Sequence, residues 1–513
     1  MKKFLLVFLA FGFIITSCKK NDNEIIEEIA EDPKEDPVVK LVADYPVQNF
    51  MWDFMNFIYF WQADVPDLAD TRFSDFEGEE YVNFLASESN PSDFFFKLCY
   101  NHENIVGENA AIDRFSRVTE NYEDLLQSFA GVSKSDGVEF GLVAYGDERS
   151  IFGFVRYIVP GSDADGKEIK RGDIFVGING NDLTRDNYID LLFGDLDTYT
   201  MNFGTLTNNT ISPSGRELSL TKQEGLIESP ILVNKVIEQN GLKIGYLMYN
   251  SFLANFDEDL NNALGDLKVA GINELILDLR YNGGGRVSSA IQLASSIYGT
   301  KTDEVFAKER FNNKRQAEWA TEFNFTDKTL EGSVINELNL SRLYVITSRN
   351  TASASELIIN GLEPHIDVVQ IGETTVGKNE FSFTFVDDPD SPFLYAGSEN
   401  NVNPNNKWAI TPLCGRIENA DGFSDYTSGL QPDRELVEDI ANMGTLGSPS
   451  TEPLLGLAIS DITGTSGKSN YEPIYPIELL SSSLEFKPLN NIMFMGGLKE
   501  NNDLKKAFST KLK

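Results

Sequence analysis

Apolar residues recur every three or four positions within residues 50–58, which is the pattern of an amphipathic helix with one buried face. Residues 122–129 show the same spacing over a shorter stretch. Between residues 137 and 225 the pattern changes to short apolar runs separated by turn-forming residues, as in 152–159, which predicts strands. We therefore expect a helical N-terminal domain over residues 41–132, with aromatic side chains packed in its core, and a β domain over 137–225.

Strands and helices alternate through residues 226–445. Apolar runs at 243–249 and 274–279 predict buried strands, and leucines at helical spacing in 256–268 predict a helix between them. Such alternation is typical of an α/β domain with a largely parallel sheet. Residues 446–513 begin with another expected helix and then lose clear periodicity, so we interpret them as a C-terminal extension without predicted chemistry.

One stretch of the α/β domain places polar side chains at the ends of two strands. Residues 342–347 predict a strand, 353–362 a short helix and 366–371 a second strand, which is followed by a loop ending at Lys378. Ser353 therefore lies where a strand passes into a helix, at the carboxyl edge of the sheet, where open α/β sheets bind ligands. The helix N-terminus adds free N–H groups and partial positive charge, which suits a developing oxyanion. Lys378 is expected at the same edge.

A nucleophilic serine needs a base, and histidine is scarce in this sequence. The chain has only two histidines, His102 and His365. His365 follows the far end of the helix that begins near Ser353, roughly 15 Å away at ~1.5 Å per residue, and His102 lies in the helical N-terminal domain. A lysine can serve instead if burial lowers its pKa enough to leave the amine neutral, which favours Lys378 over a Ser-His-Asp triad. Three apolar residues are expected to supply the dry surroundings: Phe381, Phe383 and Phe385.

Three motifs occur in an order that is typical of one protein family. They read DLRYNGGG at 278–285, TASASE at 351–356 and GETTVGK at 372–378. Together they resemble the tail-specific, or C-terminal processing, protease family of serine peptidases. The resemblance implies a ClpP/crotonase-like α/β protease core, with Ser353 as the nucleophile and Lys378 as its base.

The same resemblance implies an oxyanion hole made by two backbone N–H groups, those of Ala354 and of Gly284 or a neighbour in the glycine run. The group that orients the lysine is left open. Some family members have a glutamine four residues after the lysine, where this chain has Ser382, and Glu356 is a second candidate. The chain also departs from the family pattern at Gly283, where many members have proline.

Within the β domain, residues 160–183 read PGSDADGKEIKRGDIFVGINGNDL and resemble a PDZ domain. PDZ domains take an extended C-terminal peptide as an added strand, and N–H groups of a loop hold its carboxylate. The resemblance implies that the residues matching this loop bind peptide: Phe140, Gly141 and Leu142. A β domain that binds no peptide is the alternative.

The N-terminus has the parts of an export signal. Two lysines precede an apolar run at 4–15, and small polar residues then lead to Cys18. Ile-Thr-Ser-Cys resembles a bacterial lipobox, which implies a signal peptide over 1–18 and a lipid on Cys18; an ordinary secretory signal is the alternative. Acidic residues and prolines make 19–40 a solvated linker. We therefore expect a lipid-anchored protein of the cell envelope, at the outer membrane and on its periplasmic or surface face.

The composition narrows the class of function. The 513-residue chain is 41% hydrophobic and 11% aromatic and carries a formal net charge of −36, which indicates several packed domains and argues against binding nucleic acid. We find no metal-ligand cluster or phosphate-binding loop in the sequence, so no metal or cofactor is predicted. Cys99 and Cys414 lie far apart in the sequence, and a disulfide between them and two buried free thiols both stay open.

These observations predict an α/β multidomain serine endopeptidase of the cell envelope that cleaves peptides or unfolded proteins, recognised through their C-termini, by a Ser-Lys dyad. A non-proteolytic peptide-binding or scaffold lipoprotein, which would use the PDZ-like domain alone, is the main alternative. Such a scaffold has no need for Ser353 and Lys378 together. An esterase that uses the same serine is a further alternative.

Overall fold

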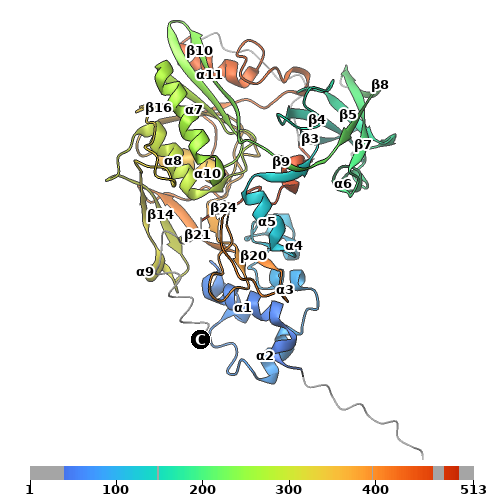
Figure 1. The fold of residues 1–513 in the computed structure, drawn as a ribbon, viewed down its shortest axis with the longest axis vertical. Coiled ribbons are helices and arrows are strands. Elements are labelled where there is room, and N and C mark those ends of the chain that lie inside the picture. Colours follow the sequence, from blue (N-terminus) through green and yellow to red (C-terminus); the bar gives the residue numbers. More distant parts are fainter. Residues whose placement is uncertain (1–39, 147–148, 209, 396, 466–478, 496–513) are drawn as a thin grey trace, which may run out of the picture.

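The computed structural model describes residues 40–146, 149–208, 210–395, 397–465 and 479–495 (Figure 1). The predicted lipidation site, Cys18, and nearly all of the predicted linker lie outside these residues. The described part has a helical N-terminal region, a β-rich region and an α/β core, so the predicted multidomain α/β fold class is confirmed. In Figure 1 the helical region lies at the lower end, with the other two above it. Among the helices of the described residues, none has the length and apolar character needed to cross a membrane.

The N-terminal region is built around α1 (Pro46–Ile58), whose apolar face the sequence predicted. Met51 and Met55 on this helix are fully buried, and the ring of Phe54 packs 4.7 Å from that of Phe385 in the core. This contact joins the helical region to the sheets beside the candidate site. The other helices of the region are α2 (Glu79–Leu85), α3 (Pro91–Lys97), α4 (Glu103–Val106) and α5 (Tyr122–Phe129).

The α/β core is built on a six-stranded sheet with the order β10-β11-β12-β16-β17-β22, in which β10 is antiparallel to its neighbour and the other strands are parallel. Leu275 and Leu277 of β12 belong to one hydrophobic core and Ile276 to another, as alternation along a strand requires. Because both faces are covered, these strands read as continuous apolar runs in the sequence. The strands are β10 (Ile231–Gln239), β11 (Leu242–Tyr249), β12 (Glu274–Asp278), β16 (Arg342–Thr347), β17 (Asp367–Gly372) and β22 (Arg434–Glu435).

Helices cover both faces of this sheet. Residues of α7 (Asp257–Ala270), α8 (Val287–Tyr298) and α10 (Ala354–Leu362) pack with one face. Residues of α11 (Pro453–Thr463), at the top of Figure 1, pack with the other. The two helices that the sequence predicted in this core agree with α7 and α10 to within two residues at each end.

The β-rich region is a sheet with the order β23-β3-β4-β5-β7-β8, in which β6 also pairs with β5. Phe140, Leu142 and Phe175 lie in its hydrophobic core. The edge strand β23 (Ser481–Ser482) comes from the C-terminal extension, so this part of the chain returns to the β-rich region. The other elements are β2 (Val132–Ser135), β3 (Val138–Tyr145), β4 (Ser150–Ile158), β5 (Ile174–Ile178), β6 (Asn181–Asp182), α6 (Tyr188–Phe193), β7 (Thr198–Thr207), β8 (Thr210–Thr221) and β9 (Gln223–Ile227), and β2 pairs with β9.

A second six-stranded sheet has the order β13-β24-β18-β21-β14-β15 and lies beside the candidate site. Its strand β24 (Met493–Phe494) also comes from the C-terminal extension and lies between β13 (Gly285–Arg286), which follows the glycine run, and β18 (Glu380–Ser382), which follows Lys378. The other strands of this sheet are β14 (Val305–Phe311), β15 (Glu322–Asn324) and β21 (Leu413–Asn419), and the short helix α9 (Gln316–Trp319) lies between β14 and β15 in the chain. A three-stranded sheet joins β1 (Arg117–Thr119), β20 (Ala409–Thr411) and β19 (Phe385–Val386).

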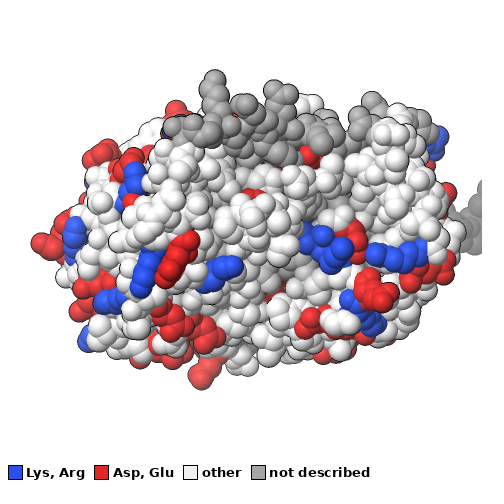
Figure 2. All heavy atoms as spheres, turned by 90° about the horizontal axis from the view of Figure 1, so that it is seen from above, with Lys and Arg blue, Asp and Glu red and all other residues white. Residues whose placement is uncertain are grey.

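The acidic excess is mixed with basic residues on the surface. Figure 2 shows Lys and Arg interspersed with Asp and Glu on the face that it presents. Exposed ion pairs such as Lys407–Glu123, at 3.2 Å, belong to this mixed surface. Each pair of this kind contributes about 0–1 kcal/mol.

Candidate active site

Ser353 occupies a sharp turn between β16 and α10. Its backbone has φ +67° and ψ −117°, a conformation that side-chain-bearing residues rarely adopt. The residue is fully buried, and its Oγ has no hydrogen-bond partner among the described residues. A backbone of this kind costs on the order of 1–3 kcal/mol and persists only where the surroundings enforce it. Nucleophilic serines of other hydrolases also lie on strained strand-to-helix turns.

Two of the sequence motifs meet at this turn. The Thr351 hydroxyl donates to the Leu279 carbonyl at 2.9 Å. The backbone N–H of Ala352 and the hydroxyl of Ser355 both donate to the Asn282 carbonyl, at 3.1 and 3.0 Å. The TASASE turn is therefore fastened to the segment that leads into the glycine run.

The Glu356 carboxylate joins the TASASE turn to the GETTVGK loop. It accepts hydrogen bonds from the backbone N–H groups of Ser353 (2.7 Å), Gly377 (2.7 Å) and Lys378 (2.9 Å), and from the Thr375 hydroxyl. Burial raises the pKa of Glu356 to about 7, although these donors favour the ionised form. The carboxylate thus fixes the backbones of Ser353 and Lys378 relative to each other and does not contact the lysine amine.

Lys378 is fully buried, as its predicted role requires. Its Nζ donates to the Glu380 carbonyl at 2.9 Å and lies 5.5 Å from the centre of the Phe115 ring. Burial lowers the pKa of Lys378 to about 7; the carboxylates of Glu380 and Glu356 oppose this shift and Arg117 adds to it. An amine with this pKa is about half neutral at pH 7 and can accept a proton.

The serine and the lysine are not hydrogen-bonded to each other in this structure. Ser353 Oγ has no partner, and the Lys378 amine donates to the carbonyl of Glu380. Hydrogen bonds between catalytic groups are often absent without substrate, so the dyad stays a prediction. Neither histidine contacts Ser353: His102 Nε2 bonds the Ser116 carbonyl, and His365 Nε2 bonds the Val305 carbonyl.

Sequence reasoning missed the part that the N-terminal region plays at Lys378. The Phe115 ring lies near the amine, and Arg114 donates to the Gly377 carbonyl at 2.8 Å. The Asp113 carboxylate shapes this turn by accepting the Phe115 N–H at 3.2 Å and the Tyr59 hydroxyl at 2.6 Å. The sequence around Phe115 has no periodicity that would place it at a site so far away in the chain.

The two predicted oxyanion donors differ in whether their N–H group already has a hydrogen-bond acceptor. Ala354 is the first residue of α10, where an N–H group has no acceptor within the helix. The Gly284 N–H donates to the Asn282 side chain at 2.8 Å, so it is already engaged in this structure. Their role in an oxyanion hole stays a prediction.

Gly284 makes a closer contact with Ser353 than any side-chain-bearing residue could. A Cβ at Gly284 would lie 2.6 Å from Ser353 Cβ and 2.8 Å from its Oγ, and the φ of +105° is itself unfavourable for other residues. We expect Gly284→Ala to displace the serine and lower kcat/KM about a hundredfold or more. Steady-state kinetics on a peptide substrate measures this effect. Unchanged kinetics would contradict the contact.

The predicted orienting residues do not touch the amine. Ser382 is buried, but its hydroxyl has no hydrogen-bond partner, and its backbone belongs to β18. Glu356 binds backbone N–H groups and the Thr375 hydroxyl, and not the amine. The group that holds the Lys378 amine is the Glu380 carbonyl, which the sequence did not indicate.

Phe140, Gly141 and Leu142 lie in strand β3 and not in a loop, which corrects the sequence-based placement. Val138, Phe140 and Leu142 alternate along the strand and enter the core of the β-rich region. One edge of β3 pairs with β4, and the other pairs with β23. Peptide binding by these residues stays a prediction.

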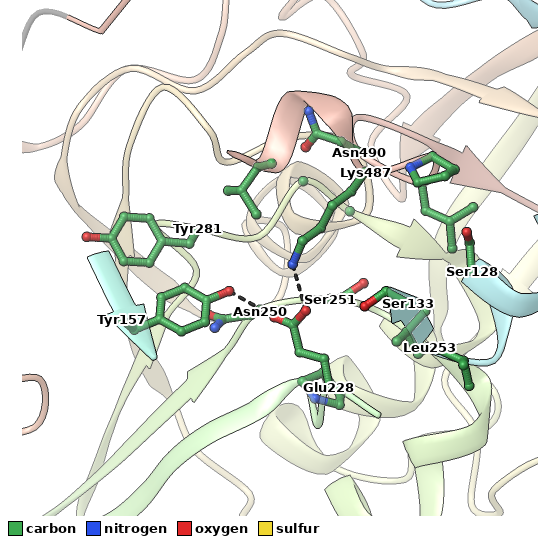
Figure 3. Close-up of a pocket in the computed structure, with 18 residues that line it drawn as sticks. Ser128, Ser133, Tyr157, Glu228, Asn250, Ser251, Leu253, Tyr281, Lys487 and Asn490 are labelled. Atoms are coloured by element: carbon green, nitrogen blue, oxygen red, sulfur yellow. Dashed lines mark hydrogen bonds and ion pairs between the residues drawn. The ribbon is translucent and has the colours of Figure 1, made fainter. Parts of the chain in front are cut away.

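A cavity of about 110 Å³ lies beside Gly284 (Figure 3). One wall comes from the core and the opposite wall from the C-terminal extension, whose Lys487 reaches toward Glu228. Residues that line the cavity include Tyr157, Glu228, Leu253, Tyr281, Lys487 and Asn490. Because Gly284 touches Ser353, this cavity is the candidate pocket for a substrate side chain.

The part of the chain that the structure describes bears on two expectations, those for metal ligands and for the two cysteines. Within it, no three His, Cys, Asp or Glu side chains are grouped so as to hold a metal ion. Cys99 and Cys414 are both buried free thiols in the structure.

Two family profiles match the chain, and both belong to peptidase family S41. The profile described as Peptidase family S41 matches residues 243–416, and the Peptidase S41 N-terminal domain matches residues 46–117. The chain carries two domains of peptidase family S41. The first match contains all three motifs, and the second contains the segment that packs near Lys378.

Relatives within this family carry protease names. The chain is 26% identical to a carboxyl-terminal-processing protease of Picosynechococcus sp., over 53% of this chain and 62% of that protein. It is 25% identical to a tail-specific protease of Haemophilus influenzae, over 47% of this chain and 33% of that protein. Each match thus spans less than two thirds of the relative. A crystal structure of a candidate S41 protease from Bacteroides fragilis aligns with a TM-score of 0.61 and 25% identity, covering 85% of this chain and all of that chain.

Proposed function

We propose that this S41 protein is a serine peptidase in which Ser353 is the nucleophile and Lys378 is the general base. The observation that carries the proposal is a fully buried lysine whose pKa is lowered to about 7, joined through the Glu356 carboxylate to a serine on a strained turn. A lysine that served only for solubility would be exposed. A serine that only capped a helix would not need this backbone conformation.

The proposed reaction needs one proton carrier. The neutral Lys378 amine turns from the Glu380 carbonyl to Ser353 and accepts its hydroxyl proton while Oγ bonds to the scissile carbonyl carbon. Negative charge develops on the carbonyl oxygen, near the Ala354 N–H at the start of α10. The protonated lysine then gives its proton to the leaving amine as the C–N bond breaks. Water attacks the acyl-enzyme, loses a proton to Lys378 and releases the acid, with the proton returned to Ser353.

Peptides or unfolded proteins are the proposed substrates, in keeping with the protease names of the relatives. Recognition of substrate C-termini and the location in the cell envelope stay predictions from the sequence. A non-proteolytic peptide-binding protein is the second candidate. The observation that favours it is that β23 pairs with the edge of β3 opposite β4. Addition of a strand to such an edge is a common mode of peptide binding.

Hydrolysis by the purified full chain separates these two candidates. We expect cleavage of a labelled, unfolded protein to be lost in Ser353→Ala and kept in Ser296→Ala, which removes another buried hydroxyl that has no hydrogen-bond partner, on α8. Cleavage that survives in Ser353→Ala, or absence of cleavage in the wild type, would contradict the proposed peptidase.

A further inference from the structure

Within residues 479–487 of the C-terminal extension, 480–482 lie along β3 as a short added strand, and a 3-10 helix over Ser483–Phe486 follows. Ser481 and Ser482 pair antiparallel with Leu142 and Gly141. The Leu480 N–H donates to the Leu142 carbonyl at 2.8 Å. The free edge of β3, where a peptide would add, is thus filled by the chain itself.

The end of this segment forms specific polar contacts with the start of β3. The Phe140 N–H donates to Ser483 Oγ at 3.0 Å, and that hydroxyl lies 2.7 Å from the Glu139 carboxylate. The Ser483 oxygen therefore accepts the hydrogen bond that a peptide ligand would accept at this position.

Two carboxylates, those of Glu139 and Glu228, contact Lys487 at the end of the segment. Lys487 Nζ lies 2.8 Å from the Glu139 carboxylate. It also lies 2.6 Å from the Glu228 carboxylate, the contact drawn in Figure 3. Burial raises the pKa of Glu139, and the Lys487 ammonium opposes this shift. The Phe486 ring stacks on Phe193 of α6, with centroids 3.6 Å apart. Without a cation between them, the two carboxylates would repel each other in a partly desolvated place.

The segment is held by the polar contacts above and by modest apolar packing, in which Leu484 is buried and Leu479 and Leu480 are partly buried. Strand β23 has two residues, and three successive serines bury little apolar area. The Phe486 side chain keeps much of its surface exposed, at 41% for the residue. Each hydrogen bond contributes about 0.5–1.5 kcal/mol net, so a competing strand with the same groups can replace this one.

The following residues cross the candidate active site. Asn490 lines the cavity beside Gly284, and its Oδ1 would lie only 2.3 Å from a Cβ placed on Gly283. Strand β24 then pairs with β13 on one side and with Ser382 of β18 on the other. The extension thus joins the β3 edge to the two strands that follow the glycine run and Lys378.

We propose that the edge of β3 and the Glu139–Glu228 pair form a binding site for an extended peptide that carries a lysine or arginine, and that residues 479–487 are its resident occupant. A substrate segment of this kind would displace the occupant and, with it, the wall of the cavity beside Gly284. The consequence for cleavage rests on the proposed peptidase function, whereas the binding site itself does not.

The test uses the full chain and a fluorescein-labelled peptide with the sequence of residues 479–487. Lys487→Ala weakens the resident segment, and Ser482→Pro disrupts it independently, because Ser482 has φ −153° and proline requires about −65°. Lys407→Ala, which breaks an exposed ion pair with Glu123, is the matched control. We expect the peptide to bind both variants at least tenfold more tightly than the wild type or the control, by fluorescence anisotropy. A peptide with K487E should bind the variants at least tenfold more weakly.

Equal affinity for the two peptides, or equal binding to all the folded proteins, would overturn the proposed site. Thermal unfolding shows whether each variant is folded, and the two variants act on different contacts. If the proposed peptidase function also holds, both variants should cleave an unfolded substrate several-fold faster than the wild type. Selective peptide binding with no cleavage by any protein supports the site and contradicts the peptidase. Cleavage at wild-type rate, without peptide binding, supports the peptidase and contradicts the site.

Discussion

Replacing Lys378 with arginine is expected to lower kcat/KM about a thousandfold or more, to the level of Lys378→Ala. A guanidinium stays protonated across the physiological range, so it cannot accept the Ser353 proton. The pKa of the native lysine, lowered to about 7 by burial, is what makes the amine a base. Because the two residues act as a unit, the double variant Ser353→Ala/Lys378→Ala should be hardly worse than either single variant.

The control for this substitution is Lys235→Arg. Lys235 is another lysine whose Nζ donates to a backbone carbonyl, that of Gly447, at 2.8 Å. We expect this variant to cleave at the wild-type rate. Near-native turnover by folded Lys378→Arg would show that another group takes the serine proton.

Loss of the Arg280 side chain is expected to cause the largest fall in stability. This fully buried guanidinium bonds the carboxylates of Asp278 (2.7 Å), Glu452 (2.9 Å) and Glu438 (3.1 Å). Arg280→Met leaves buried negative charge without its partner, which costs about 3–5 kcal/mol. The measurement is the urea midpoint of unfolding, followed by circular dichroism.

Arg342→Met is the matched control, because Arg342 pairs with Glu274 at 2.7 Å in a partly exposed place. Its cost should stay below about 1 kcal/mol. A midpoint for Arg280→Met that equals the control would mean that the buried cluster contributes little.

The same cluster lowers the pKa of Glu438 to about 2, because Arg171 and Arg280 outweigh the effect of burial. Its contribution to stability is therefore complete above about pH 5.5, is lost as the pH falls from the unfolded-state pKa near 4.5 to the folded-state pKa of about 2, and is absent below that.

Local pattern was enough to predict the elements around Ser353. The buried strand before it, the helix after it and the strand before Lys378 all follow from apolar runs and helical spacing. The pattern Ser353-Ala-Ser-Glu356 is also a known signature of a helix start, in which the glutamate bonds the backbone N–H of the serine. That signature could have indicated the position of Glu356, although not its bonds to Gly377 and Lys378.

Contacts between residues far apart in the sequence determine the features that local pattern could not predict. The aromatic group near the Lys378 amine is Phe115, from the N-terminal region, and the group that holds the amine is a backbone carbonyl. Strands β23 and β24 have two residues each, too short to produce a period, and exist because neighbouring strands offer free edges. The resemblance to a PDZ domain predicts a loop at Phe140, whereas the alternating apolar residues of β3 favour the strand that the structure has there.

The central claim is that a neutral Lys378 activates Ser353, and the rate of covalent modification of Ser353 as a function of pH tests it most directly. A fluorophosphonate probe phosphonylates an activated serine, with loss of fluoride and without the need for a bound peptide, and mass spectrometry identifies the labelled residue. Because only the neutral amine is a base, the rate should rise about tenfold between pH 6 and pH 8, with a midpoint near the lowered pKa of about 7. Glu356 has a pKa in the same range and its carboxylate raises the pKa of Lys378, so Glu356→Gln should label more slowly and keep the rise with pH, with the midpoint moved to lower pH. A rate that does not change with pH over this range, or equal labelling of folded Lys378→Arg, would contradict the account.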